Sequence, residues 1–255
     1  MRTLRLAVLA VALASQVRLA WADDPETTAL RMTGVNGRTS GGVYVGPYQA
    51  VLGSVPGAPA IDIFCVDYLN HSYIGQTETA VMTHLVDGAD LSHTRIGSSG
   101  MLTLRGTDYS ALDRYRMAAL LTDQFALTAA TTPPNLVSQE WGNIHRAIWN
   151  ITAGPGAGVP TAGADAWLSW VTRWYNDNAA NHDWSGYIVL SDATMRPGAP
   201  MVGGMQEFIT TTPEPAAILL MGVVIILGLG LYQRLSAAVE QEVDAKDKAA
   251  DRRKT

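Results

Sequence analysis

IDIFCVDY, residues Ile61–Tyr68, is the strongest strand signal in the chain. β-Branched and aromatic residues dominate it, and the two aspartates, Asp62 and Asp67, lie toward its ends. A segment of this kind is typical of a strand with at least one buried face. It therefore predicts a sheet, and the segments on either side must supply the partner strands.

Weaker strand signals lie on both sides of it. GGVYVGPYQAVL, Gly41–Leu52, alternates apolar and small residues around a Gly-Pro break, which predicts two short strands meeting at a bend. We expect further strands at Ile74–Leu85, Tyr187–Leu190 and Met205–Thr210. The polar residues 23–40 are expected to form a loose lead-in, and residues 86–106 a loop.

Helical periodicity begins near residue 108. Apolar residues at helical spacing predict helices over Asp108–Leu127, with Asp108 as N-cap, over Asn135–Thr152 and over Ala162–Asn178. Strands, then helices, then strands predict an α+β fold, namely an antiparallel β sandwich or barrel with a two- to three-helix insert.

Charge and composition exclude several classes of protein. The net charge of −5 argues against a nucleic-acid binder, which needs a basic face to displace counterions. Cys65 is the one cysteine, so neither an internal disulfide nor a thiolate metal cluster can form. The histidines have no metal-ligand spacing, and Asp62 and Asp67 do not form a calcium loop. We therefore expect neither a metal nor a cofactor.

The N-terminus is typical of a cleaved signal peptide, residues 1–22. Arg2 and Arg5 precede the apolar run Leu6–Ser15, which is too short to cross a bilayer. Ala20-Trp21-Ala22 then offers an A-x-A cleavage site. We expect export by the Sec machinery and a mature domain over residues 23–212.

A second apolar run lies near the C-terminus. Pro213-Glu214-Pro215 is held extended by its prolines, and uncharged residues fill Ala216–Tyr232 before Arg234. A helix over these ~17 residues is ~26 Å long and just spans the hydrocarbon core. We therefore expect residues 213–234 to form the Pro-Glu-Pro motif followed by a single transmembrane helix. The basic residues of the tail, 235–255, place that tail in the cytoplasm and the domain in the periplasm, anchored in the inner membrane.

Together, Pro213, Glu214, Pro215, the apolar span and Arg234 resemble the sorting signal of PEP-CTERM proteins. That resemblance implies an exosortase as partner, processing at the motif, and release to a cell surface or an extracellular matrix that contains exopolysaccharide. The tail after Arg234 departs from the family, in which the basic cluster usually ends the protein. The alternative is an ordinary C-terminal anchor.

Two other segments resemble the signatures of bacterial surface thioester domains. Phe64-Cys65-Val66-Asp67 matches the aromatic-Cys segment, and Ala147-Ile148-Trp149 matches the end of a helix bearing T-Q-x-A-apolar-W. In that family Cys and Gln side chains form an internal thioester. His145 stands at the Gln position of the helix signature, and imidazole has no carbonyl. The resemblance therefore implies a related scaffold from which the covalent chemistry is missing, with degenerate thioester positions at Cys65 and His145.

Many PEP-CTERM proteins also resemble this chain in four short segments: Gly46-Pro47-Tyr48, Phe64–Asp67, Ala147–Trp149 and Gln206-Glu207-Phe208. Taken together, the sequence predicts an exported, membrane-tethered surface or matrix protein with a structural or binding role and no catalysis. The alternatives are a thioester-like adhesin, or a carbohydrate-binding surface protein that uses some of the seven tryptophans.

Cys65 itself could be a buried small hydrophobe, or could pair with His145 as a Cys–His dyad.

Overall fold

The structure is a computed structural model that describes residues 25–154, 157–194 and 204–211. The expected signal peptide, the Pro213-Glu214-Pro215 motif, the apolar span and the polar tail lie outside these residues. Among the described residues, no helix combines the length and the apolar character needed to cross a membrane.

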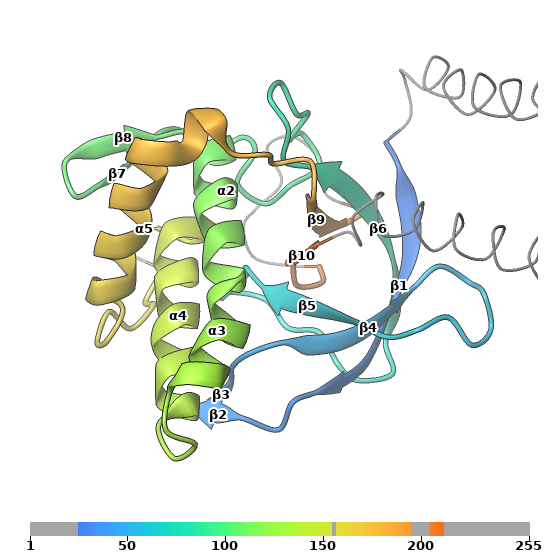
Figure 1. The fold of residues 1–255 in the computed structure, drawn as a ribbon. Coiled ribbons are helices and arrows are strands. Elements are labelled where there is room, and N and C mark those ends of the chain that lie inside the picture. The colour runs from blue at the N-terminus through green and yellow to red at the C-terminus, as the bar shows by residue number, and fades with distance from the viewer. Residues whose placement is uncertain (1–24, 155–156, 195–203, 212–255) are drawn as a thin grey trace, which may run out of the picture. The chain divides into compact units, whose positions relative to one another are not determined.

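Six antiparallel strands close into a barrel, which confirms the barrel form of the predicted fold (Figure 1). Their order around the barrel is β1 (Thr27–Val35), β4 (Tyr48–Leu52), β5 (Ile61–Cys65), β10 (Phe208–Thr211), β9 (Tyr187–Asp192) and β6 (Thr77–His84). Two small hairpins stand apart from it, β2 (Thr39–Ser40) with β3 (Val43–Tyr44), and β7 (Leu102–Leu104) with β8 (Thr107–Tyr109).

The helices pack together on one side of the barrel (Figure 1). They are α2 (Ala111–Thr122), α3 (Gln124–Thr131), α4 (Val137–Thr152) and α5 (Asp165–Asn178), and a short 3-10 turn, η1 (Ala179–Asn181), follows α5. The predicted apolar face of α4 is confirmed, because Trp141, Ile144, Ile148 and Ile151 are all buried. The predicted helix over 108–127 divides at Asp123 into α2 and α3.

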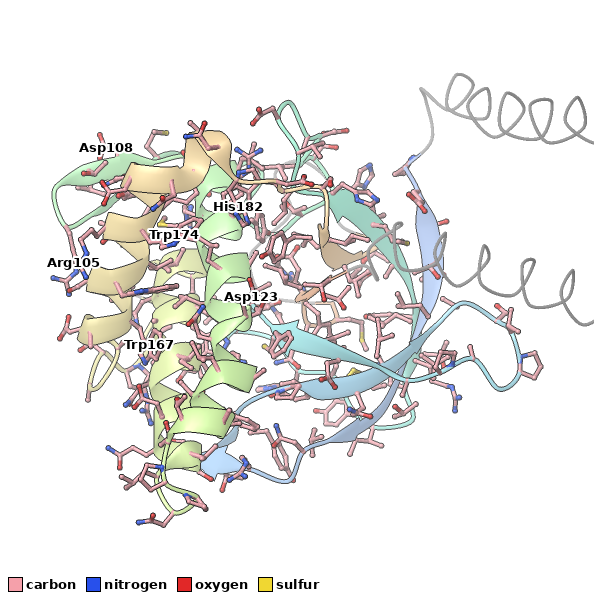
Figure 2. The ribbon with its side chains drawn as sticks, viewed as in Figure 1. Arg105, Asp108, Asp123, Trp167, Trp174 and His182 are labelled. Carbon is pink, nitrogen blue, oxygen red and sulfur yellow. The ribbon has the colours of Figure 1, made fainter. Side chains whose placement is uncertain are left out.

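Asp108 is not the N-cap that the sequence predicted. It lies in β8, at the hairpin beside α5, where its carboxylate accepts a hydrogen bond from Thr103 (Figure 2). Ser110 caps α2 instead. Its side chain and that of Asp113 each accept from the other's backbone N–H, which is a capping box.

The lead-in expected at residues 23–40 contains a long barrel strand. Along β1 the side chains of Leu30 and Met32 are buried, whereas Arg31 and Thr33 are exposed. The alternation is real but short, and the polar outward residues Thr27, Arg31 and Thr33 hide it in the composition. Pairing with β4 on one side and β6 on the other makes β1 the strand that closes the barrel.

A continuous core joins the barrel to the helices. Every residue of β9 is buried, because one face lines the barrel and the other meets the helices, where the Tyr187 hydroxyl donates to Asp123 at the end of α2. On the outer side, Trp167 of α5 donates its indole N–H to Glu140 of α4 over 2.7 Å (Figure 2). The barrel is thus held against a fixed helical layer.

Candidate functional site

The register between β5 and β10 places two distant segments side by side. Phe208 pairs with Cys65, and the Val66 N–H donates to the Glu207 carbonyl over 3.0 Å. Gln206 therefore enters the barrel wall where the chain leaves β5. Its Nε2 lies 3.3 Å from Cys65 Sγ and 3.4 Å from the Asp67 carbonyl oxygen. The thiol is thus in direct contact with a side-chain carboxamide.

Cys65 is wholly buried, and its surroundings favour the protonated thiol. The sulfur donates to the Asp67 carbonyl at 3.3 Å and interacts with the Trp149 indole N–H, which has no oxygen or nitrogen acceptor. Burial, followed by the negative charge of Asp67, raises the pKa of the Cys65 thiol to about 12, against the opposing effects of the Asp67 backbone and the Trp149 indole. At neutral pH this cysteine is not a thiolate.

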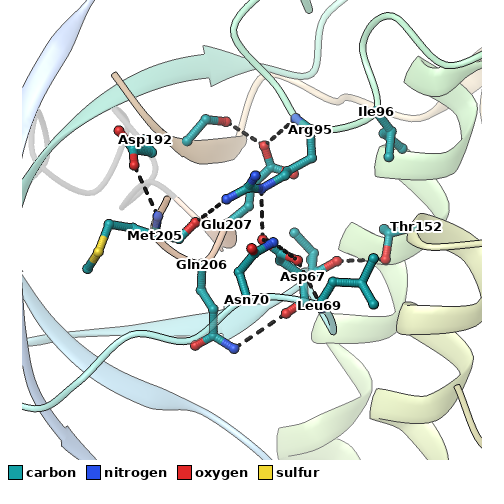
Figure 3. Close-up of polar contacts among 12 residues, drawn as sticks. Asp67, Leu69, Asn70, Arg95, Ile96, Thr152, Asp192, Met205, Gln206 and Glu207 are labelled. Carbon is teal, nitrogen blue, oxygen red and sulfur yellow. Dashed lines mark hydrogen bonds and ion pairs between the residues drawn. The ribbon is translucent and has the colours of Figure 1, made fainter. Parts of the chain in front are cut away.

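An arginine ties together the two segments that meet at Cys65 (Figure 3). Arg95 Nε donates to Asp67 Oδ2 over 2.8 Å, its guanidinium also donates to the Met205 carbonyl, and its backbone N–H donates to Glu207 Oε1 over 2.9 Å. Arg95 and Asp67 are both buried. The pair fixes the loop after Cys65 and the residues on both sides of Gln206 in one network.

Glu207 extends this network into the core. Its carboxylate also accepts from Ser191 Oγ over 2.6 Å and from the Tyr115 hydroxyl. Burial raises the pKa of Glu207 to about 7, with these hydrogen bonds acting in the opposite direction.

His145 lies one side chain away from the sulfur. Its ring stacks on that of Trp149 with 4.9 Å between centroids and 3° between planes. Nδ1 accepts the Gly46 N–H over 3.1 Å, so the neutral ring carries its proton on Nε2, which is buried and has no partner. Burial lowers the pKa of His145 to about 3. This imidazole is poorly suited to take a proton from a thiol.

The four short segments that the sequence analysis singled out, 46–48, 64–67, 147–149 and 206–208, meet at this site. Gly46 contacts His145, Tyr48 pairs with Ile63 of β5, and Thr152 at the end of α4 donates to the Val66 carbonyl over 2.6 Å. Gln206 completes the set. The structure therefore brings Cys65 and His145 into one neighbourhood and adds Gln206 between Cys65 and solvent.

A cavity of about 460 Å³ opens over Gln206. Aromatic side chains supply much of its wall, from Tyr44, Tyr48, Tyr68 and Trp149. Asp67 and His71 also line it. The volume falls within the range of ~300–1,000 Å³ that is usual for small-molecule sites, so a ligand of modest size could reach the carboxamide.

The described residues form neither a cluster of metal ligands nor a hydrogen-bonded Cys–His dyad at this site. Within residues 25–154, 157–194 and 204–211, no group of three or more His, Cys, Asp or Glu side chains is placed to hold a metal ion. A Cys–His dyad requires a hydrogen-bonded base and an accessible thiolate. Here the imidazole bonds to Gly46 and the thiol bonds to a carbonyl.

Sequence reasoning missed Gln206 and Arg95 as site residues. Gln206 stood out only as part of the short segment 206–208, and 141 positions separate it from Cys65, so no local spacing relates the two. The conclusion that covalent chemistry is missing rested on the lack of a carbonyl at His145. Gln206 supplies a carboxamide from another part of the chain, and that ground no longer holds.

No protein-family model, no curated protein and no solved structure matches this chain. The sorting residues Pro213, Glu214, Pro215 and Arg234 fall outside the described part of the chain, so their role stays a prediction.

Proposed function

We propose that this chain is an exported, membrane-tethered surface protein whose barrel forms an internal thioester between Cys65 and Gln206 and binds its target covalently. One observation carries the proposal: the carboxamide of Gln206 and the buried sulfur of Cys65 are 3.3 Å apart, measured from Nε2 to Sγ. The carboxamide carbon is one C–N bond, ~1.33 Å, from that nitrogen. Rotation of the side chain can bring it to the ~3–3.5 Å from which bonds form.

The reaction balances within the site. Cys65 Sγ bonds to Gln206 Cδ, the Cδ–Nε2 bond breaks, and the thiol proton leaves with the nitrogen as ammonia. A nucleophile then attacks Cδ, the S–C bond breaks, and the thiol regains a proton. The nucleophile ends covalently attached to the side chain of residue 206. Each molecule reacts once, so the role is binding rather than catalytic turnover.

Intact-mass measurement of the full chain tests the proposal. We expect a species lighter by one ammonia, which resists thiol reagents after unfolding and regains a free thiol when treated with methylamine. Gln206→Glu and Cys65→Ser should each abolish the mass loss. Gln139→Glu, on an α4 residue outside the cavity lining, is the matched control and should retain it. Quantitative thiol labelling of the untreated, unfolded chain would refute the thioester.

Export and sorting form the second part of the proposal and rest on the two ends of the sequence. The signal-peptide pattern and Pro213-Glu214-Pro215 with its apolar span support delivery to the periplasmic face of the inner membrane and processing by an exosortase. We expect the mature species from exosortase-containing cells to lack residues 216–255. Recovery of the intact C-terminus from such cells would leave the protein as a simple anchored domain.

A further inference from the structure

The cavity over Gln206 determines what can approach the proposed thioester. Gln206 and Trp149 belong to its wall, so a molecule in the cavity contacts the residue that carries the carboxamide. Tyr68 packs against Trp149 with 5.2 Å between ring centroids, and Tyr44 leaves 51% of its surface exposed at the β2–β3 hairpin. The wall is therefore a set of aromatic faces next to the reacting atoms.

The carboxylate in the cavity wall has no oxygen free to bind a cationic ligand. Asp67 is the one carboxylate among its lining residues, and both of its oxygens are occupied. Oδ1 accepts from the Leu69 N–H and Asn70 Nδ2, while Oδ2 accepts from Arg95 Nε and Asn70 Nδ2, all between 2.7 and 3.2 Å. A lysine ammonium would find no free carboxylate oxygen there. A neutral polyhydroxylated ring could lay its C–H face on the aromatic side chains while its hydroxyl groups reach polar atoms.

A hydroxyl acceptor needs a base, whereas an unprotonated amine does not. His71 is exposed and lines the same cavity as Gln206. Imidazole is the side chain best suited to accept a proton near neutral pH. We infer that the cavity is the acceptor site for a sugar and that His71 is the general base that directs the thioester to a sugar hydroxyl. This inference rests on the proposed thioester.

The transfer balances without another reagent. The sugar oxygen bonds to Gln206 Cδ, the Cδ–Sγ bond breaks, His71 accepts the hydroxyl proton, and the departing sulfur takes up one proton. The products are an ester between residue 206 and the sugar, and the free thiol of Cys65. The high pKa of that buried thiol favours its final protonation.

The test compares two nucleophiles on the full chain that has already lost ammonia. Methyl glucoside and methylamine are supplied separately, and the adducts are followed by intact mass. We expect an ester adduct with the glucoside that forms on the order of 100-fold more slowly in His71→Gln, the size usual for loss of a general base. Coupling of methylamine should stay within twofold. His93→Gln is the matched control, because His93 lines a separate hollow, and should behave as the wild type.

Tyr44→Ala tests the aromatic wall with small risk to folding, since Tyr44 is exposed. It should slow the glucoside reaction at subsaturating sugar and leave the methylamine reaction unchanged. Coupling to methylamine but not to the glucoside, or equal rates in wild type and His71→Gln, would overturn the sugar acceptor while leaving the thioester in place. Failure to lose ammonia at all would refute both.

Discussion

Replacing His145 by Gln should change how stability depends on pH. In the native state the imidazole is wholly buried, its Nδ1 accepts the Gly46 N–H, and its pKa falls from 6.5 to about 3 because burial disfavours the charged ring. In the unfolded state the ring regains its ordinary pKa. The unfolded chain therefore binds one more proton between about pH 3 and 6.5. The stability from the neutral ring is complete above pH 6.5 and is lost as the pH falls through that window.

The magnitude follows from the width of the window. Each pH unit within it is worth about 1.36 kcal/mol, so moving from about pH 7 to about pH 4.5 should cost about 2.5 kcal/mol through His145 alone. Glu207 opposes this. Its native pKa is raised to about 7, so its contribution is present below pH 4.5 and disappears as the pH rises to about 7. The two effects nearly cancel in the wild type, and only the difference between variant and wild type isolates His145.

The assay is urea unfolding of the full chain, followed by tryptophan fluorescence at about pH 7 and about pH 4.5. On going from about pH 7 to about pH 4.5, the unfolding free energy of His145→Gln should rise by about 2.5 kcal/mol relative to that of the wild type. This relative change does not depend on how much stability the substitution costs at pH 7. Ile148→Val on the same helix is the matched control. It should cost about 0.5–1.5 kcal/mol equally at both pH values. An equal difference between His145→Gln and wild type at both pH values would show that the native imidazole titrates normally, and would refute the buried neutral ring.

Three further substitutions address the frame of the site. Arg95→Met should cost about 3–5 kcal/mol, because it leaves Asp67 buried without its ion-pair partner, and the folded fraction should show a reduced ammonia loss by intact mass. Gly46→Ala should destabilise by at least about 2 kcal/mol more than Gly53→Ala in urea unfolding, since both have positive φ but only at Gly46 would a Cβ come within 2.3 Å of other side chains. Equal costs for the two glycine variants would contradict this packing argument. Thr152→Val should lower the free energy of unfolding by about 1–3 kcal/mol in the same assay, because the Val66 carbonyl loses its hydrogen-bond donor. An unchanged urea midpoint would show that this hydrogen bond does not stabilise the fold.

The periodic elements of the fold could be predicted because their signal is local. The spacing of apolar residues predicts both the buried face of α4 and the strand that begins at Ile61. β1 was missed because its outward residues are polar enough to resemble a loop, and only pairing with β4 and β6 defines it as a strand. The order of strands around the barrel has no local signal at all, since β10 lies between β5 and β9.

Half of the candidate site could be found from the sequence and half could not, because only part of it has a local signal. Cys65 stands out in its strand, but its partner is fixed by the β5–β10 register, which places Gln206 next to the sulfur from the far end of the domain. His145 was assigned by position along a helix signature. In space it contacts Trp149, and Trp149 contacts the sulfur, so it acts on the site through packing.

The burial of Cys65 distinguishes between the roles open to a lone cysteine. A nucleophilic cysteine in an enzyme is usually partly exposed, and a nearby positive charge lowers its pKa. Here burial and the carboxylate of Asp67 raise the pKa of the thiol, and the imidazole of His145 is held neutral by burial. A thioester is preserved by the opposite conditions, namely a buried sulfur and a high thiol pKa. Exclusion of water protects the acyl group from hydrolysis, and a poorly stabilised thiolate is a poor leaving group, which slows exchange of the thioester once the thioester has formed. The Arg95 network holds the carboxamide at the sulfur, and the cavity admits a nucleophile from the side of Gln206. The features that make Cys65 a poor hydrolase nucleophile are thus those that would preserve a reactive bond until its target arrives.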